Sequence, residues 1–153
     1  LTKFGAELLK EELHQLKTKE RRSVIDAIAE ARSHGDLSEN AEYDAAKERQ
    51  AFVEGRIAEL ESKLSTSQVI DPTTLDAEGR VVFGATVDLE DLDSSQKVTY
   101  QIVGMDEADL KMNKVSITSP IARALIGKSA GDVVEVQAPS GPREYEILEV
   151  RYV

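Results

Sequence analysis

Two long stretches of helix-forming residues meet at Ser33-His34-Gly35-Asp36-Leu37-Ser38-Glu39-Asn40-Ala41-Glu42-Tyr43-Asp44. Residues 3–66 contain no proline and are rich in Ala, Leu, Glu, Lys and Arg, which all favour helices. Gly35 suits the left-handed position that follows a helix end, and Asp36 suits the N-cap of the next helix. Because the break is short, we expect the two helices to be antiparallel neighbours.

Apolar residues on each side of this break recur at the spacing that a packed helix pair requires. The first stripe consists of Leu9, Leu13, Leu16, Val24, Ile28 and Ala31. Its two halves are displaced by about three helical turns, so the stripe stays on one face despite a break in heptad phase. The second stripe consists of Tyr43, Ala46, Val53, Ile57, Leu60 and Leu64. We predict an antiparallel α-helical coiled-coil hairpin about 42 Å long, from helices of about 28 residues.

The pattern changes near residue 67. Ser65-Thr66-Ser67 and Asp71-Pro72-Thr73-Thr74 are typical of a linker. Short β-type runs follow at Val81–Phe83, Ala85–Leu89, Val98–Val103, Val115–Thr118, Val133–Val136 and Tyr145–Val153. One short helix is expected at 120–125, with Ser119 as its cap and Gly127 after its end.

These patterns predict an α+β protein of two domains. Residues 1–70 form the hairpin, with an acidic tip near 35–43, and residues 71–78 form a linker. Residues 79–153 form an antiparallel β-sheet domain with one short helix.

The composition excludes several kinds of function. The 153 residues include 19 basic and 29 acidic side chains, a net charge of −10, which argues against broad binding to duplex DNA. There is no cysteine, which excludes disulfides, thiolate metal sites and a cysteine nucleophile, and two histidines leave little material for a Ser-His-Asp triad. No apolar run approaches the length of a membrane span. We expect a cytoplasmic protein.

Two carboxylates, Asp36 and Glu39, stand out at the expected tip. On a helix this spacing places them on one face, where they could share a hard cation such as Mg²⁺. The same spacing fits a capping-box variant, in which each side chain meets an orphan backbone N–H. The positive end of a helix disfavours a cation beside it, so we expect no metal bound stably by the free protein. A metal shared with another macromolecule stays open.

Four stretches of the sequence carry a family resemblance. They are Ala27-Ile28-Ala29-Glu30-Ala31-Arg32 through Gly35-Asp36-Leu37-Ser38-Glu39-Asn40-Ala41-Glu42-Tyr43, then Gly55-Arg56-Ile57, Phe83-Gly84-Ala85-Thr86-Val87 and Ser119-Pro120-Ile121-Ala122-Arg123-Ala124-Leu125-Ile126-Gly127. In this order, over almost the whole chain, the sequence resembles the bacterial transcript-cleavage (elongation) factors of the GreA/GreB family. The resemblance implies an N-terminal coiled-coil hairpin and a C-terminal FKBP-like domain. The modest basic content of the helices favours the GreA type.

The resemblance also implies a function, that of a cofactor protein of bacterial RNA polymerase rather than an enzyme. The globular domain would dock at the rim of the secondary channel, and the hairpin, as part of a monomer, would reach the active centre and the nascent RNA 3′ end. Asp36 and Glu39 match the family's two catalytic tip acids, which help the polymerase hold a second Mg²⁺ and orient the attacking water. The polymerase then cleaves backtracked RNA, because two metal ions stabilise the attacking and leaving oxygens.

Further residues match the family or suit its function. Three match other tip positions and are expected to position the loop or the RNA: Asn40, Glu42 and Tyr43. Three basic residues could meet RNA phosphates, or could be solvated charges paired with nearby acids: Arg32, Lys47 and Arg49. Four match the family's polymerase-docking region, although they also fit a helix cap and a buried first turn: Thr118, Ser119, Pro120 and Ile121.

Three alternatives remain. The first is an inhibitory or regulatory channel binder of the same architecture; such relatives are expected to carry additional acids at the tip, where this sequence has Ser38. The second is a coiled-coil adaptor with no role in chemistry. The third is a prolyl isomerase, which a β domain with four aromatic residues and no tryptophan does not favour, because a proline pocket needs apolar lining.

Overall fold

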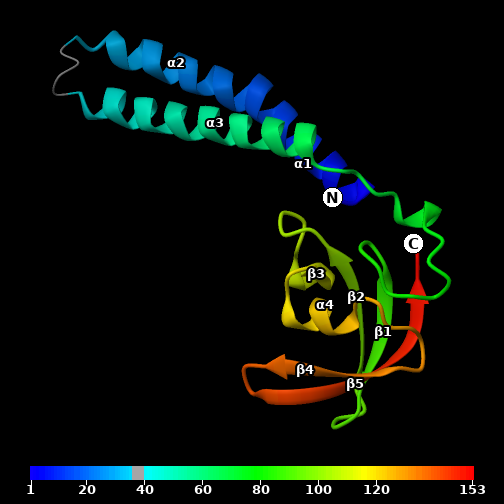
Figure 1. Ribbon diagram of the computed structural model, residues 1–153. Coiled ribbons are helices and arrows are strands. Elements are labelled where there is room, and N and C mark those ends of the chain that lie inside the picture. Colours follow the sequence, from blue (N-terminus) through cyan, green and yellow to red (C-terminus); the bar gives the residue numbers. More distant parts are fainter. Residues whose placement is uncertain (36–39) are drawn as a thin grey trace. The chain divides into compact units, whose positions relative to one another are not determined.

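The computed structural model describes residues 1–35 and 40–153 (Figure 1). They form two compact units: a hairpin unit, Ala6–Ser67, and a sheet unit made of Leu1–Gly5 and Gln68–Val153. A helical hairpin followed by a sheet with one short helix confirms the predicted fold class. The boundaries at residues 70 and 79 stay a prediction.

The first residues of the chain belong to the sheet unit because they are bonded to the segment that follows the hairpin. The Lys3 N–H donates to the Ile70 carbonyl at 2.7 Å, and the Ile70 N–H donates to the Leu1 carbonyl at 2.9 Å. Thr2 and Ile70 thereby form a parallel bridge. The prediction that all of residues 1–70 form the hairpin did not foresee this pairing.

The described residues of the hairpin unit form three helices and one irregular turn. The first arm of the hairpin is helical throughout and consists of α1 (Lys3–Gln15), the π-helical turn η1 (Leu16–Glu20) and α2 (Arg21–Arg32). The returning helix is α3 (Ala41–Thr66), and Figure 1 shows α2 and α3 side by side. Their shared core consists of Val24, Ile28, Ala46, Val53 and Ile57, with Leu13, Leu16, Ala27 and Tyr43 packed against it. The core is one layer thick, as the two apolar stripes predict.

The break in heptad phase has a structural counterpart at η1, where the helix widens to π geometry between Leu16 and Glu20. Nearby, the Thr18 hydroxyl donates to the His14 carbonyl at 2.7 Å. A π turn adds about one residue to a helical turn and so shifts the phase of the apolar stripe. This local widening lets both halves of the stripe face α3.

Ion pairs flank the core of the hairpin. Arg56 pairs with Glu12 at 2.7 Å, and Arg21 pairs with Glu54 at 2.8 Å. Both pairs join α3 to the helical arm that precedes the turn. The Arg21 guanidinium donates two hydrogen bonds to Glu54 and lowers the pKa of that carboxyl. These partners are exposed, so each pair contributes little by itself.

The sheet unit contains five strands in the order β3-β2-β1-β5-β4. The strands are β1 (Thr86–Asp91), β2 (Lys97–Val103), β3 (Lys114–Ser116), β4 (Val133–Ala138) and β5 (Gly141–Arg151). All neighbours are antiparallel except β2 and β3, which are parallel. The helix α4 (Pro120–Leu125) packs on β4 and β3, with Ser119 as its N-cap, as predicted.

One predicted strand is wrong. Val81–Phe83 is not a strand; its neighbour Arg80 forms a single bridge to Ser129. Val81 is fully buried, and its N–H donates to the Lys128 carbonyl at 2.8 Å. Gly84 then turns the chain at φ +89°, before β1 starts. The apolar run is explained by burial rather than by sheet pairing.

The core of the sheet unit is deeper than that of the hairpin. It consists of Val81, Val87, Leu89, Ile102, Val115, Ala122, Leu125, Val134, Val136 and Ile147. Two 3₁₀ turns, η3 (Pro72–Thr74) and η4 (Leu110–Met112), lie outside it. Within residues 1–35 and 40–153, no helix is both long and apolar enough to cross a bilayer.

Candidate functional site

The candidate site is the turn between α2 and α3. The predicted catalytic and metal-binding residues, Asp36 and Glu39, lie outside the residues that the structure describes. Their flanks are described. Gly35, after the end of α2, has φ +98°, the left-handed conformation predicted for it.

The N-cap predicted at Asp36 is wrong, because α3 begins at Ala41 and its N-cap is Asn40. Both acids therefore precede α3 in the sequence, and the prediction that they share one helix face lies outside the described residues. Asn and Asp cap helices about equally well, and Asp36-x-x-Glu39 imitates a capping box, so the sequence did not distinguish the two.

Asn40 holds the two ends of the turn together. Its Oδ1 accepts a hydrogen bond from the Tyr43 N–H at 3.0 Å, which caps α3. Its Nδ2 donates to the Ala31 carbonyl at 2.7 Å, in the last turn of α2. One half-buried side chain thus satisfies a donor of one helix and an acceptor of the other. The expected role of Asn40 in positioning the loop or the RNA stays a prediction.

The other two predicted tip residues occupy different environments. Tyr43 is half-buried and packs against the hairpin core. Glu42 is exposed, and its Oε2 lies 3.2 Å from Nδ1 of His34, so the pair is ionic only when His34 is protonated. Tyr43 therefore supports the end of the helix pair, whereas Glu42 lies on the surface beside the turn.

The three predicted basic residues separate into two groups. Arg49 on α3 lies 3.0 Å from Oε2 of Glu20 and 3.2 Å from Oγ of Ser23. Arg49 therefore has an acidic partner within the hairpin, as the alternative of a solvated, paired charge expects, and its contact with RNA stays a prediction. Arg32 and Lys47 instead line one hollow on the helix pair, and Lys47 donates to Gln50 at 3.1 Å. Ile25, Ile28 and Ala29 complete that hollow with apolar side chains.

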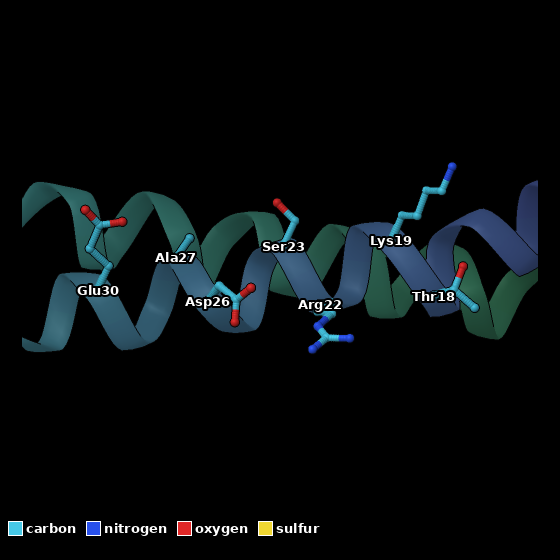
Figure 2. Close-up of a pocket in the computed structure, with 7 residues that line it drawn as sticks. All are labelled: Thr18, Lys19, Arg22, Ser23, Asp26, Ala27 and Glu30. Carbon is cyan, nitrogen blue, oxygen red and sulfur yellow. The ribbon is translucent and has the colours of Figure 1, made fainter.

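A second hollow lies further along the same shaft (Figure 2). It is lined by Thr18, Lys19, Arg22, Ser23, Asp26, Ala27 and Glu30. These residues all come from η1 and α2, and Figure 2 shows their side chains spread along one helix. A surface formed by one helical arm does not enclose a ligand, so we interpret this hollow as the exposed face of η1 and α2.

The predicted docking residues surround the start of α4. The Ser119 hydroxyl accepts a hydrogen bond from the Ala122 N–H at 3.3 Å, which caps the helix. Thr118 and Pro120 are exposed, whereas Ile121 packs against the sheet core. The cap and the buried first turn are therefore present, and the exposed Thr118 and Pro120 leave a surface for a partner.

The described residues do not themselves form a metal site. In residues 1–35 and 40–153, no three His, Asp or Glu side chains gather closely enough to hold an ion. Carboxylate oxygens are the ligands that Mg²⁺ prefers, so Asp36 and Glu39 supply the appropriate donor type.

Both units match known families. Residues 1–69 match the family described as "Transcription elongation factor, N-terminal", and residues 76–152 match "Transcription elongation factor, GreA/GreB, C-term". The helical hairpin and the sheet unit are therefore the two parts of a transcription elongation factor.

Similar proteins refine this class. The transcription elongation factors GreA of Ralstonia nicotianae and of Neisseria meningitidis serogroup A are 70% and 68% identical to this chain, over all of it and 97% of each relative. A solved structure, the GreA factor homolog 1 protein of Thermus thermophilus, is 30% identical over 99% of this chain and 97% of that chain, with a TM-score of 0.43. The chain belongs to the GreA/GreB family of transcription elongation factors.

Proposed function

We propose that this protein binds bacterial RNA polymerase and stimulates the cleavage of backtracked nascent RNA by the polymerase itself. The sheet unit docks at the rim of the secondary channel through Thr118 and Pro120, while the hairpin inserts its turn into the active centre. Asp36 and Glu39 help to hold a second Mg²⁺ and a water molecule. The cleaved RNA then has a paired 3′ end, and elongation resumes.

Asn40 is the observation that carries this proposal. A simple connection between two helices needs no side chain that bonds to both of them. Here the Asn40 side chain joins the end of α2 to the start of α3. The acids lie in the segment between these two anchors. Catalytic groups must be held within a small error of their working positions, and Asn40 ties together the two helices that flank the acids.

The chemistry needs both partners because two carboxylates occupy only part of the coordination shell of Mg²⁺. The remaining ligands come from the polymerase, its RNA and water. When bound, the ion lowers the energy of the attacking and leaving oxygens in phosphodiester hydrolysis. This chain supplies negative charge and orientation, and the polymerase supplies the active site.

The hollow that contains Arg32 and Lys47 supports a secondary contact with the RNA. The cations of Arg32 and Lys47 could bind a phosphate of the extruded 3′ segment, and the apolar Ile25 beside them could contact a base. Arg49 is not part of this contact, because Glu20 already pairs with its guanidinium.

Release of 3′ RNA fragments tests the proposal. Backtracked polymerase complexes are incubated with Mg²⁺, with and without the protein, and the fragments are counted over time. Wild-type protein should accelerate release, and Asp36→Asn and Glu39→Gln should each reduce the stimulated rate at least about tenfold. Both variants should compete with wild type for polymerase, which shows that docking is intact.

Two outcomes contradict the proposal in different ways. If wild-type protein slows cleavage, it is an inhibitory channel binder of the same architecture. If both variants cleave as well as wild type, the acids have no chemical role.

A further inference from the structure

The loop at residues 104–113, between β2 and β3, buries one acidic side chain. Its large apolar side chains are exposed: Met105 by 71%, Leu110 by 81% and Met112 by 60%. Its buried side chain is an acid, Glu107, which is 8% exposed. A buried acid is uncommon unless it is paired, so Glu107 is the residue of this loop that needs a structural explanation.

Glu107 is bonded to the first residues of the chain. Its Oε1 accepts a hydrogen bond from the Thr2 N–H at 3.0 Å, and its Oε2 accepts one from the Thr2 hydroxyl. Thr2 Oγ1 in turn accepts from the Gly5 N–H at 3.2 Å. Thr2, 1% exposed, therefore caps α1 while Glu107 holds Thr2. The carboxylate also suits the positive N-terminal end of that helix.

Gly5 leaves the space that this arrangement needs. A methyl group at Gly5 would overlap the Glu107 carboxylate and lie 2.7 Å from its Cγ. Gly5 is inside α1, where glycine is less favourable than alanine. Packing against Glu107 accounts for a glycine at this position. Gly55, in α3, differs because a methyl group there would meet nothing within 4 Å.

A second contact comes from Lys114, the first residue of β3, directly after this loop. The Lys114 ammonium lies 3.8 Å from the centre of the Phe4 ring, which is a cation–π contact. The loop is closed beneath it, because Asp109 and Lys114 exchange backbone hydrogen bonds of 2.9 Å in both directions. Thr2, Phe4 and Gly5, all at the start of α1, are thus held by one closed loop.

We propose that Glu107 is a positioning residue for transcript cleavage, which fastens the first turn of α1 to the loop at residues 104–113. Its partners are all in the sheet unit, and α1 continues beyond Gly5 as part of the hairpin unit. The inference rests on the proposed function, because it concerns the accuracy with which the hairpin delivers Asp36 and Glu39.

The length of the hairpin explains why a contact at the start of α1 affects the turn between α2 and α3. The helical run that Glu107 holds, from the start of α1 to the end of α2 (residues 3–32), extends about 45 Å at about 1.5 Å per residue. A rotation of about 2° at one end of such a helix displaces the other by more than about 1 Å. An error of that size can reduce a catalytic rate about 100-fold. Docking through Thr118 and Pro120 does not depend on this accuracy.

A pair of glycine substitutions tests the proposal in the full-length protein with polymerase. Gly5→Ala displaces Glu107 while improving helix propensity, and Gly55→Ala improves propensity alone. With backtracked complexes and Mg²⁺, Gly5→Ala and Glu107→Ala should lower the maximal cleavage rate at saturating protein about tenfold or more, with a half-saturating concentration within about twofold of wild type. Gly55→Ala should behave as wild type. Glu107→Gln keeps an acceptor for the Thr2 N–H and should restore most of the maximal rate.

Hydrogen exchange gives a second readout that does not need activity. The backbone amides of Thr2 and Gly5 should exchange faster in Glu107→Ala and Gly5→Ala than in wild type, while amides of β1 and β5 stay protected. Equal maximal rates for Gly5→Ala and Gly55→Ala, or a lower melting temperature as the sole effect of Glu107→Ala, would overturn the positioning role. An inactive wild-type protein would instead contradict the proposed function itself.

Discussion

The hairpin unit and the sheet unit bury their apolar residues in cores of different thickness. Leu89, Ile102 and Ile147 of the sheet unit have no exposed surface, and they lie in a core closed by α4. The hairpin core is a single layer whose members range from Val24 at 1% to Ile28 at 9% exposed, and Leu60 of α3 is fully buried. Ion pairs such as Glu12–Arg56 border it.

This difference indicates that the two units have different tasks, extension by the hairpin unit and docking by the sheet unit. A pair of packed helices gives a long, stiff hairpin, but it leaves most of each helix in solvent. The sheet unit gives a stable surface around α4 but no reach. We therefore expect mutations in the sheet unit to act through stability and docking, and mutations at the turn between α2 and α3 to act through chemistry.

Truncation of a core leucine should show the largest difference in stability between a variant of the sheet unit and a variant of the hairpin unit. Leu89→Ala in β1 should lower the free energy of unfolding by about 2–5 kcal/mol, because the fully buried site leaves a cavity. Leu13→Ala in α1, at a half-buried position, should cost less because solvent can fill the space. Urea unfolding followed by circular dichroism measures both. Equal losses would contradict the difference in core depth.

Removal of the cap at the turn should have an intermediate effect. Asn40→Ala should destabilise the hairpin by about 0.5–2 kcal/mol, because it removes the acceptor for the Tyr43 N–H and the donor to the Ala31 carbonyl. Asn40→Asp keeps the cap but loses the donor, so it separates the two roles. The Asp variant should unfold near wild type yet stimulate cleavage less. Full cleavage activity in Asn40→Asp would show that the link to α2 is dispensable.

Acid should weaken the sheet unit through two carboxylates. A hydrogen bond from the Asp93 N–H, and then one from Arg143, hold the pKa of Asp91 below its ordinary 3.8. The Thr99 hydroxyl does the same for the pKa of Asp88. Because both pKa values are lowered by folding, their stabilisation is complete above pH 3.8 and is lost as the pH falls through the folded-state values.

Urea unfolding at a series of pH values between neutrality and strong acid measures this loss. Asp91→Asn should be less stable than wild type at neutral pH and should show a shallower decline in acid. A decline as steep as that of wild type would mean that other carboxylates govern the acid response.

The smallest effect is expected on the open side of α3. Gly55→Ala should stabilise the hairpin by about 0.5–1 kcal/mol, because alanine favours a helix and its methyl group meets nothing within 4 Å. Thermal unfolding measures the gain. A loss of stability would indicate a contact at Gly55 that the hairpin core does not account for.

The regular parts of the fold could be predicted from the sequence because their signals are local. The stripes that include Val24 and Val53 have helical spacing, and Ser119 with Pro120 marks the start of α4. The strand predicted at Val81–Phe83 failed because a buried apolar run has the same appearance whether or not it pairs with a neighbour.

The candidate site was predictable in part. Family motifs identified the residues of the turn, but the spacing of Asp36 and Glu39 suggested a cap that Asn40 actually provides. The bonds from Asn40 to Ala31, and from Glu107 to Thr2, join residues that no local pattern relates. Such contacts arise from tertiary packing, which spacing along the chain does not encode.

The Mg²⁺ dependence of RNA cleavage tests the central claim most directly. The rate in backtracked polymerase complexes is measured over a series of Mg²⁺ concentrations, with saturating wild-type protein, with Asp36→Asn/Glu39→Gln protein and without protein. If the acids help to hold the second ion, wild type lowers the half-saturating Mg²⁺ concentration, and the double variant, although bound, leaves it at the value for polymerase alone. An identical Mg²⁺ dependence for wild type and the double variant would contradict the account.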